Sequence, residues 1–153
     1  MSRPKLPFAV VLIAATCAVG SFASAPADQY ATFDASSPTI TDRKTGLTWQ
    51  RTASPVQPSL AAARGYCAGL GKWRLPTVKE LLTLVDEKSH DEVQGGVAVH
   101  RYIDSNAFPS SPGGPFAAET PVIVGNKIWV VDFSTGDADR AADGQVYARC
   151  VAY

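Results

Sequence analysis

The chain has little of what most catalytic and metal-binding sites require. Its 153 residues include three cysteines, two histidines and one methionine, and no stretch resembles a phosphate-binding loop, a metal cluster or an activated nucleophile. Lys and Arg together number 14, as do Asp and Glu, so no excess of positive charge indicates nucleic-acid binding. After residue 27 no run is apolar and long enough to span a bilayer. These absences favour a protein without a cofactor that is not an enzyme.

One apolar run stands at the beginning of the chain. Arg3 and Lys5 precede a hydrophobic stretch from 8 to 19, and small residues follow at 23, 25 and 27, which is the pattern of a secretory signal peptide. We therefore assign residues 1–27 to a signal peptide, cleaved after position 23 or 27, and residues 28–153 to one mature domain. A retained membrane anchor and lipid attachment at Cys17 are the alternatives.

Cleavage changes the charge and sets the expected location. Removing Arg3 and Lys5 leaves 12 basic residues against 14 acidic ones, a net charge of −2. The cations are also scattered singly, which again argues against a polyanion such as nucleic acid as partner. We expect an exported domain, periplasmic, extracellular or on the cell surface, with no segment inserted in the membrane.

Two cysteines remain in the mature chain, Cys67 and Cys150, and export makes a disulfide between them the expected state. One distant pair is a poor zinc site, and neither cysteine has a histidine near it in the sequence to act as a base. The bond would join the first helix to the last strand. It would close a loop of about 80 residues, worth about 4 to 5 kcal/mol if chain entropy dominates.

Two helices are predicted in the first half of the mature chain. Ser59 can cap a helix that runs to about Leu70, where Gly71 stops it. Pro76 forces the preceding residues to be extended, and Thr77 with Glu80 makes a capping box. The second helix is therefore expected from about 78 to about 86.

Strand patterns occupy both ends of the mature chain. Gly46 lies in a turn between strands expected at 39–41 and 47–50, and a weaker edge strand is expected at 30–37. Gly125-Asn126 predicts a hairpin between 120–124 and 127–133, in which Trp129, Val131 and Phe133 face the core. A third strand is expected at 145–153, after an acidic loop at 136–144. Segments 87–100 and 105–115 are expected to be irregular.

Several motifs agree in order and spacing with one bacterial family over about residues 38 to 152. The motifs are Thr41–Gln50 (Thr-Asp-Arg-Lys-Thr-Gly-Leu-Thr-Trp-Gln), Tyr66-Cys67, Trp73–Leu81 (Trp-Arg-Leu-Pro-Thr-Val-Lys-Glu-Leu), Ile103-Asp104, Trp129–Phe133 (Trp-Val-Val-Asp-Phe) and Arg149-Cys150-Val151. On these residues the chain resembles the Lcl C-terminal domain family.

The resemblance implies a C-type-lectin-like α+β fold, with two helices packed on a twisted antiparallel sheet, long irregular loops and one disulfide joining Cys67 to Cys150. Members are exported or surface proteins of bacteria, and the naming member is an adhesin that binds sulfated glycosaminoglycans as a trimer. Two features depart from this pattern. The family's Tyr-Trp-Ser-Ser-Thr segment is Phe-Ala-Ala-Glu-Thr at 116–120, and the cationic patch that a sulfated polymer needs is missing. The fold transfers to this chain, whereas the ligand does not.

Three aspartates, Asp137, Asp139 and Asp143, are candidate calcium ligands. Their spacing does not match an EF-hand loop and Arg140 lies among them, so a solvated turn is favoured and no metal is assigned. Glu119 and Asp132 lie near the positions where C-type lectins hold calcium, yet the surrounding motifs differ.

His90 and His100 flank Gly95-Gly96 and suggest acid-base chemistry only weakly, since no nucleophile accompanies them. Arg74 is expected to form a structural ion pair or to donate to loop carbonyls. Trp49 and Trp73 are expected in the core.

Two function classes follow from these observations. The leading hypothesis is an exported, non-enzymatic recognition or adhesion module that reads carbohydrate or another cell-surface partner through loops 87–115 and 136–144. The rivals are an enzyme on a scaffold like that of the formylglycine-generating oxidases, which would require redox-active thiols or copper ligands, and a purely structural envelope protein. The sequence defines neither the ligand nor the oligomeric state.

Overall fold

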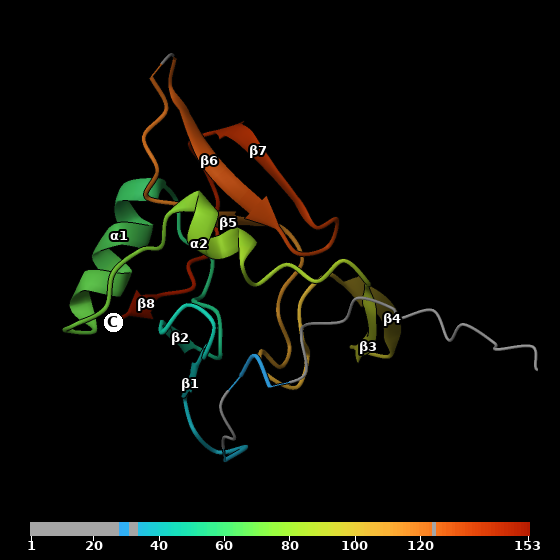
Figure 1. The fold of residues 1–153 in the computed structure, drawn as a ribbon. Coiled ribbons are helices and arrows are strands. Elements are labelled where there is room, and N and C mark those ends of the chain that lie inside the picture. Colours follow the sequence, from blue (N-terminus) through green and yellow to red (C-terminus); the bar gives the residue numbers. More distant parts are fainter. Residues whose placement is uncertain (1–27, 31–33, 124) are drawn as a thin grey trace, which may run out of the picture.

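The computed structural model describes residues 28–30, 34–123 and 125–153, so the expected signal peptide lies outside it. The described chain is a small α+β domain with two helices and antiparallel sheets (Figure 1). In chain order the elements are β1 (Thr39–Thr41), β2 (Thr48–Gln50), α1 (Leu60–Gly69), α2 (Val78–Leu82), β3 (His90–Gln94), β4 (Val97–Arg101), β5 (Pro115–Ala117), β6 (Lys127–Asp132), β7 (Asp137–Ala142) and β8 (Val151–Ala152).

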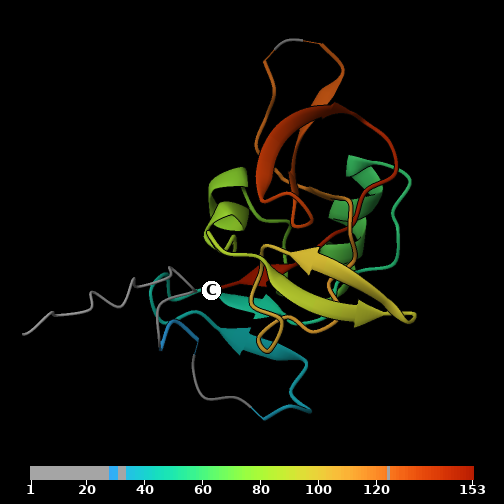
Figure 2. The same cartoon turned by 90° about the vertical axis from the view of Figure 1, so that its right-hand side faces the viewer.

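The described strands form three small sheets in place of the single sheet implied by the family resemblance. β2 lies between β1 and β8, and β6 lies between β5 and β7. β3 and β4 form a two-stranded sheet of their own, which lies in front of the others when the molecule is turned by a quarter (Figure 2). The predicted hairpin around Gly46 is confirmed, because Ile40 lies opposite Trp49 and Gly46 has a φ of +73°.

The β5–β6–β7 sheet divides the interior into two cores. Val131 and Phe133 pack on one side of β6, in the core that also holds the fully buried Trp49. Ile128 and Val130 point to the other side, where α1 covers them. The sequence predicted only the first of these faces as core, because a strand buried on both sides carries no alternation of polar residues.

Both helices begin where capping predicts. The Ser59 side chain accepts a hydrogen bond from the Ala62 N–H in the first turn of α1, and Gly71, with a φ of +93°, follows the end of that helix. Thr77 and Glu80 form the predicted capping box at the start of α2. This helix ends at Leu82 and not near residue 86, because the next amides bond to carbonyls three residues back and the Asp86 N–H bonds to Tyr102.

Buried arginines hold the long connections in place. Arg51 donates to five backbone carbonyls, those of residues 34, 35, 37, 106 and 107. Arg149 is fully buried, donates to the carbonyls of residues 50 and 51, and lies 4.7 Å from the ring of Phe108 and 5.4 Å from that of Phe116. Such charge-assisted hydrogen bonds replace regular secondary structure in these loops. As expected, residues 105–114 contain no helix or strand.

The chain before β1 is part of the domain. Gln29 is buried and donates to the Asp42 carboxylate and to the Thr83 carbonyl, and Tyr30 packs edge-on against Phe108 with ring centroids 5.3 Å apart. The edge strand expected at 30–37 falls partly on residues 31–33, outside the described residues. Of the rest, Tyr30 bridges to Asp42 and residues 34–37 contain no strand.

Segment 87–100, expected to be irregular, contains most of the β3–β4 hairpin. Gly95 and Gly96 both have positive φ, +60° and +83°, which suits a two-residue hairpin turn. The prediction was wrong because the strands on either side of the glycine pair are polar, so the sequence lacks the hydrophobic pattern that normally accompanies a hairpin turn.

Two expectations in the last third are also wrong. No strand lies at 120–123, the described part of the first strand predicted there, and the strand before β6 that pairs with it is β5. Pro121 has no N–H to donate to a sheet, and the residues before it bond to the start of α2.

The acidic segment 136–144 is not a loop, since it contains β7. The strand predicted at 145–153 is reduced to β8, preceded by single bridges at Val146 and Tyr147. Within the part of the chain that the structure describes, no helix has the length and apolarity needed to cross a membrane.

Candidate functional site

Three adjoining hollows form one surface groove, which we call the central groove. The first, the Trp73 hollow, has a volume of about 440 Å³ and is lined by Arg64, Ala68, Trp73, Arg74, Leu75, Thr77 and Glu119. The middle hollow, of about 470 Å³, is lined by Thr77, Val78, Lys79, Glu119, Thr120 and Pro121. The Trp129 hollow, of about 200 Å³, is lined by Pro121, Val122, Ile123, Trp129 and Arg140. The first two hollows share Thr77 and Glu119, and the last two share Pro121, so the three lie side by side.

The wall of the groove at residues 119–120 is fixed by hydrogen bonds to the start of α2. The Glu119 N–H donates to the Pro76 carbonyl over 2.7 Å, and the Val78 N–H donates to the Thr120 hydroxyl over 2.8 Å. Since Val78 lies in the first turn of α2, its N–H has no partner within the helix. The free donor of the helix therefore positions a segment that lies 42 residues later in the chain.

The floor of the Trp73 hollow is held by a bidentate ion pair. Arg74 donates to both carboxylate oxygens of Glu80, over 2.6 and 2.9 Å. Hydrogen bonds from Arg74, followed by those from Thr77, lower the pKa of Glu80 to about 2. The expectation that Arg74 is a structural ion-pair partner is confirmed. Trp73 beside it is only partly buried and is exposed to this hollow.

A second ion pair lies across the groove. Arg64 Nε is 2.6 Å from Glu119 Oε2, and the side chains are 48 % and 43 % exposed. The hydrogen bond to Glu119 raises the pKa of Arg64. The pair joins α1 to the segment after β5. Both residues line the Trp73 hollow, and Glu119 also lines the middle hollow. Such an exposed pair contributes little to stability, so both side chains are available for binding.

The far end of the groove is apolar. Trp129 is partly exposed, and the guanidinium of Arg140 lies 5.7 Å from the centre of its ring. Ile123 is 98 % exposed. A large apolar side chain held in water beside a tryptophan and an arginine is typical of a contact surface.

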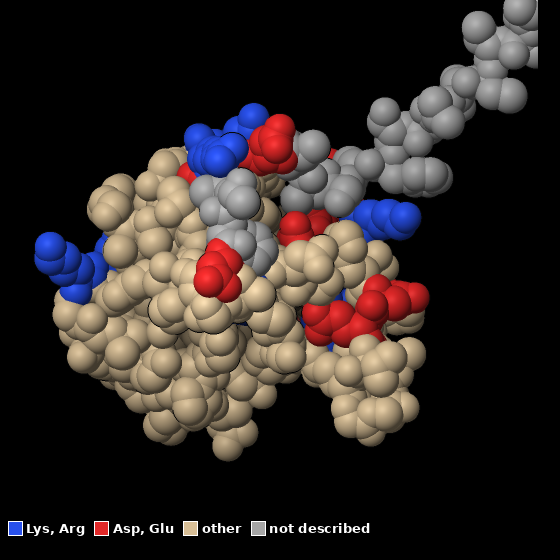
Figure 3. All heavy atoms as spheres, turned by 90° about the horizontal axis from the view of Figure 1, so that it is seen from below, with Lys and Arg blue, Asp and Glu red and all other residues tan. Residues whose placement is uncertain are grey.

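Charge is not concentrated by sign on the face that Figure 3 presents. Lys and Arg side chains occur there in separate places, with Asp and Glu side chains near several of them (Figure 3). This agrees with the balanced composition of the chain.

The three candidate calcium ligands do not converge. Asp137 and Asp139 are exposed residues of β7, while Asp143 follows the strand and accepts a hydrogen bond from the Leu60 N–H at the start of α1. No group of three or more His, Cys, Asp or Glu side chains suited to a metal ion occurs among the described residues. Asp143 thus has a helix-capping contact that the sequence did not indicate.

Glu119 and Asp132, the positions compared with calcium lectins, have separate roles. Glu119 pairs with Arg64, whereas Asp132 accepts from the Ser134 hydroxyl and N–H in the turn after β6. The two histidines lie on the β3–β4 hairpin, where His90 contacts Asp86 and His100 contacts Asp91. Each histidine therefore has a carboxylate partner near it in the chain, and neither lines the central groove.

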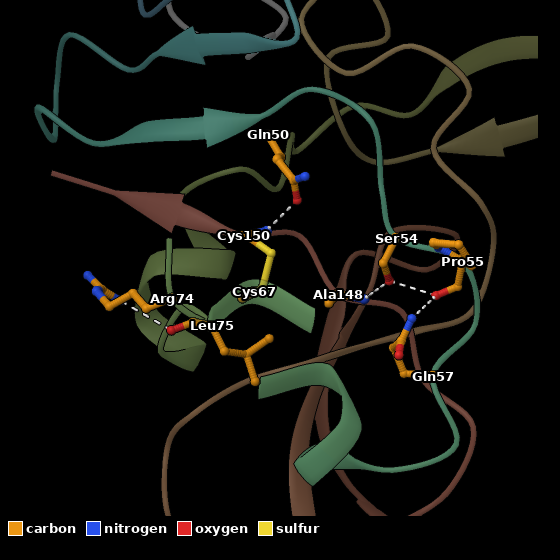
Figure 4. Close-up of a disulfide and its surroundings, with 9 residues drawn as sticks. All are labelled: Gln50, Ser54, Pro55, Gln57, Cys67, Arg74, Leu75, Ala148 and Cys150. Atoms are coloured by element: carbon orange, nitrogen blue, oxygen red, sulfur yellow. Dashed lines mark hydrogen bonds between the residues drawn. A yellow bond between two sulfur atoms is a disulfide. The ribbon is translucent and has the colours of Figure 1, made fainter. Parts of the chain in front are cut away.

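The two mature cysteines are joined. Cys67 in α1 and Cys150 just before β8 form a disulfide with Cα atoms 5.5 Å apart, and both side chains are fully buried in the second core (Figure 4). The Cys150 N–H also donates to the side chain of Gln50 (Figure 4). The bond joins the helical layer to the last strand, as expected, and leaves neither sulfur as a thiol.

Sequence reasoning missed the central groove. It assigned recognition to 87–115 and 136–144, and neither segment lines the hollows apart from Arg140. Arg64 and Glu119 are 55 residues apart, and nothing in the local pattern of either predicts the other. The sequence offered a weak signal at Trp73, which Arg74 follows directly, and none at Trp129, because Arg140 lies 11 residues further along the chain.

Comparison with known proteins gives one match. The model of the Lcl C-terminal domain family matches residues 38–152. No curated protein matches significantly. The search of solved structures also found no match.

Proposed function

Because this chain belongs to the Lcl C-terminal domain family, we propose that it is an exported recognition or adhesion module without enzymatic activity, and that it binds carbohydrate or another cell-envelope partner. The central groove is the proposed binding surface. Its position replaces the loops favoured from the sequence.

The observation that carries this proposal is the lining of the groove. Partly exposed tryptophans stand at its two ends, and the polar groups between them belong to fixed ion pairs and hydroxyls. Binding sites typically combine such aromatic surfaces with a few positioned polar groups. No cysteine, serine or histidine lines these hollows, and the carboxylate that does, Glu119, is paired with Arg64, which favours binding over catalysis.

Export and fold complete the proposal. A buried disulfide suits an oxidising compartment, and the signal-peptide pattern at 1–27 supplies the route. The two helices, antiparallel sheets and helix-to-strand disulfide are compatible with a C-type-lectin-like fold. The same bond occupies both cysteines that an oxidase on a related scaffold would require, which argues against that rival.

The test is binding of the oxidised mature chain, residues 28–153, to a glycan array and to purified envelope proteins, each with and without a chelator. We expect binding that a chelator leaves unchanged. Val122→Asp and Ile123→Asp, at the exposed end of the groove, should weaken binding of a partner that spans all three hollows, whereas Val93→Asp, on the β3–β4 hairpin and 77 % exposed in the parent, should not. Absence of binding to every glycan and envelope protein would refute the proposal.

A further inference from the structure

We propose that the central groove binds an uncharged oligosaccharide, which lies across the Arg64–Glu119 ion pair with one sugar unit in the Trp73 hollow and the next in the middle hollow. This inference rests on the proposed function and specifies the ligand class for the same site.

The first step concerns size and continuity. The two hollows have volumes of about 440 and 470 Å³ and share Thr77 and Glu119. Each lies in the range of small-molecule sites, roughly 300 to 1,000 Å³. A ligand with repeating units can therefore occupy both hollows at once and cross the residues that they share.

The second step concerns hydrogen-bonding groups. The Arg64–Glu119 contact uses Nε of the guanidinium and Oε2 of the carboxylate. Among the described residues, no hydrogen bond engages Glu119 Oε1 or the two Nη groups of Arg64. The pair thus presents an acceptor beside donors. Adjacent sugar hydroxyls donate and accept at once, so one can donate to Oε1 while its neighbour accepts from Nη.

The third step is that these groups are held in place before binding. Glu119 is fixed by its N–H bond to Pro76, and Thr120 by the bond from Val78. The Thr120 hydroxyl accepts that bond, which leaves its own hydrogen free to donate into the middle hollow. A preformed set of polar groups lowers the entropy cost of binding a flexible ligand.

The fourth step concerns the aromatic surface. Trp73 lines the hollow and is partly buried, with its packed side against the second core. A tryptophan fixed in this way offers a flat apolar surface at little conformational cost. The C–H faces of a hexose ring are apolar, and its edges carry hydroxyls, which matches a tryptophan beside an ion pair.

The final step is charge, which decides between uncharged and sulfated sugars. Each cation of the Trp73 hollow has a carboxylate partner, Arg64 with Glu119 and Arg74 with Glu80. A sulfate bonded to the free Nη groups of Arg64 would lie beside the negative charge of the Glu119 carboxylate, which repels it. Lys79, at the exposed rim of the middle hollow, is a single flexible charge. The groove therefore favours hydroxyl-rich ligands over polyanions.

The experiment measures affinity of the oxidised mature chain by NMR titration, following the indole N–H signals of Trp73 and Trp129. The probes are uncharged oligosaccharides of two to six hexose or N-acetylhexosamine units, and heparin as the sulfated comparison, at 50 and 500 mM NaCl. We expect an uncharged oligosaccharide to shift the Trp73 signal, with an affinity that changes less than about two-fold between the two salt concentrations. Heparin binding, driven by counterion release, would fall steeply over that range.

Two exposed substitutions test the site without disturbing the core. Arg64→Met and Glu119→Gln should each weaken binding of the uncharged probe about ten-fold. Their matched controls, Arg43→Met and Glu87→Gln, lie at exposed positions outside the hollows and should leave it unchanged. Unchanged circular dichroism and thermal midpoint will verify that each variant is folded.

Each result bears on one of the two proposals. Salt-sensitive binding of heparin alone would overturn the uncharged ligand and leave the recognition function standing. If the affinity for the uncharged probe is the same in both variants as in the parent protein, the proposed position of the ligand at the Arg64–Glu119 pair is overturned. If these probes do not bind but an envelope protein does, only the sugar ligand is overturned. If nothing binds in any assay, the proposed recognition function is overturned as well.

Discussion

Removing the Cys67–Cys150 bond is expected to be the most destabilising covalent change in the domain. The bond joins residues 83 positions apart. In the chain-entropy description a loop of this length restricts the unfolded chain by about 15 cal/mol/K, which is about 4.5 kcal/mol at 25 °C. Because both cysteines are fully buried in the second core, replacing them by alanine also removes contacts there, at about 1 kcal/mol for each sulfur. The expected loss is therefore about 6 to 7 kcal/mol.

That loss is a large part of the stability that a domain of this size has, roughly 5 to 15 kcal/mol. The assay is equilibrium unfolding in urea of the mature chain and of the Cys67→Ala/Cys150→Ala variant. The midpoint should fall and the m-value should rise, because the unfolded chain without the bond exposes more surface. Each single substitution should cost nearly as much as the double one, since either removes the bond.

Reduction supplies an independent readout. The parent protein should resist a thiol reductant under native conditions and become reducible only as it unfolds, because neither sulfur is accessible. A loss below about 1.5 kcal/mol with an unchanged m-value would refute the reasoning, as would rapid reduction of the folded protein.

Three further outcomes follow from single contacts. Glu80→Gln should cost about 1 kcal/mol at pH 7 because it replaces the charged, bidentate pair with Arg74 by a neutral hydrogen bond, while the Gln side chain can still complete the capping box; Lys79→Gln is the near-neutral control. Since the pKa of Glu80 is lowered to about 2 from 4.5, its contribution is present above pH 4.5 and is lost as the pH falls toward 2; an unaltered acid-unfolding profile in the variant would contradict this. Burial raises the pKa of Tyr30, so its neutral form stabilises the fold below about pH 10 and this contribution is lost as the pH rises; absorbance titration at 295 nm should show a late-ionising tyrosine that Tyr30→Phe removes. Deleting residues 28–37 should lower the thermal midpoint by at least about 5 °C, because Arg51 loses carbonyl partners there; an unchanged midpoint would show that the segment is dispensable.

Elements signalled by neighbouring residues were predictable from the sequence. The hairpin at Gly46, the caps of α1 and α2 and the ends marked by glycine depend on interactions within a few residues, and the structure has them. The disulfide was predictable from counting, since two cysteines remain after the expected cleavage. These features require no knowledge of the tertiary structure.

Pairings between distant segments were not predictable. The residue pattern of β6 is compatible with several partner strands. Its pairing with β5 depends on the hydrogen bond that holds Thr120, just before Pro121, at the start of α2. The acidic residues of β7 suggested a loop, yet an exposed edge strand tolerates charge, and charged side chains protect such an edge from pairing with other chains. Residue type alone does not separate these cases.

The family match and the folded unit also have different boundaries. The match begins at residue 38, whereas Gln29 is buried and Tyr30 packs on Phe108. The carbonyls of residues 34, 35 and 37 satisfy a buried arginine. A fragment cut at the family boundary would leave Arg51 with fewer acceptors inside the protein, which is costly for a buried cation.

The segment in which this chain departs from its family's pattern forms part of the proposed binding surface. Residues 116–118 of that segment are buried, while Glu119 and Thr120 line the groove. Ala117, in place of the pattern's tryptophan, fits against the second core, and Glu119, in place of a serine, supplies the carboxylate that neutralises Arg64. The Glu119 carboxylate therefore adds a negative charge beside Arg64 at a position where the pattern has a neutral side chain, while the Glu119 N–H keeps its hydrogen bond to Pro76.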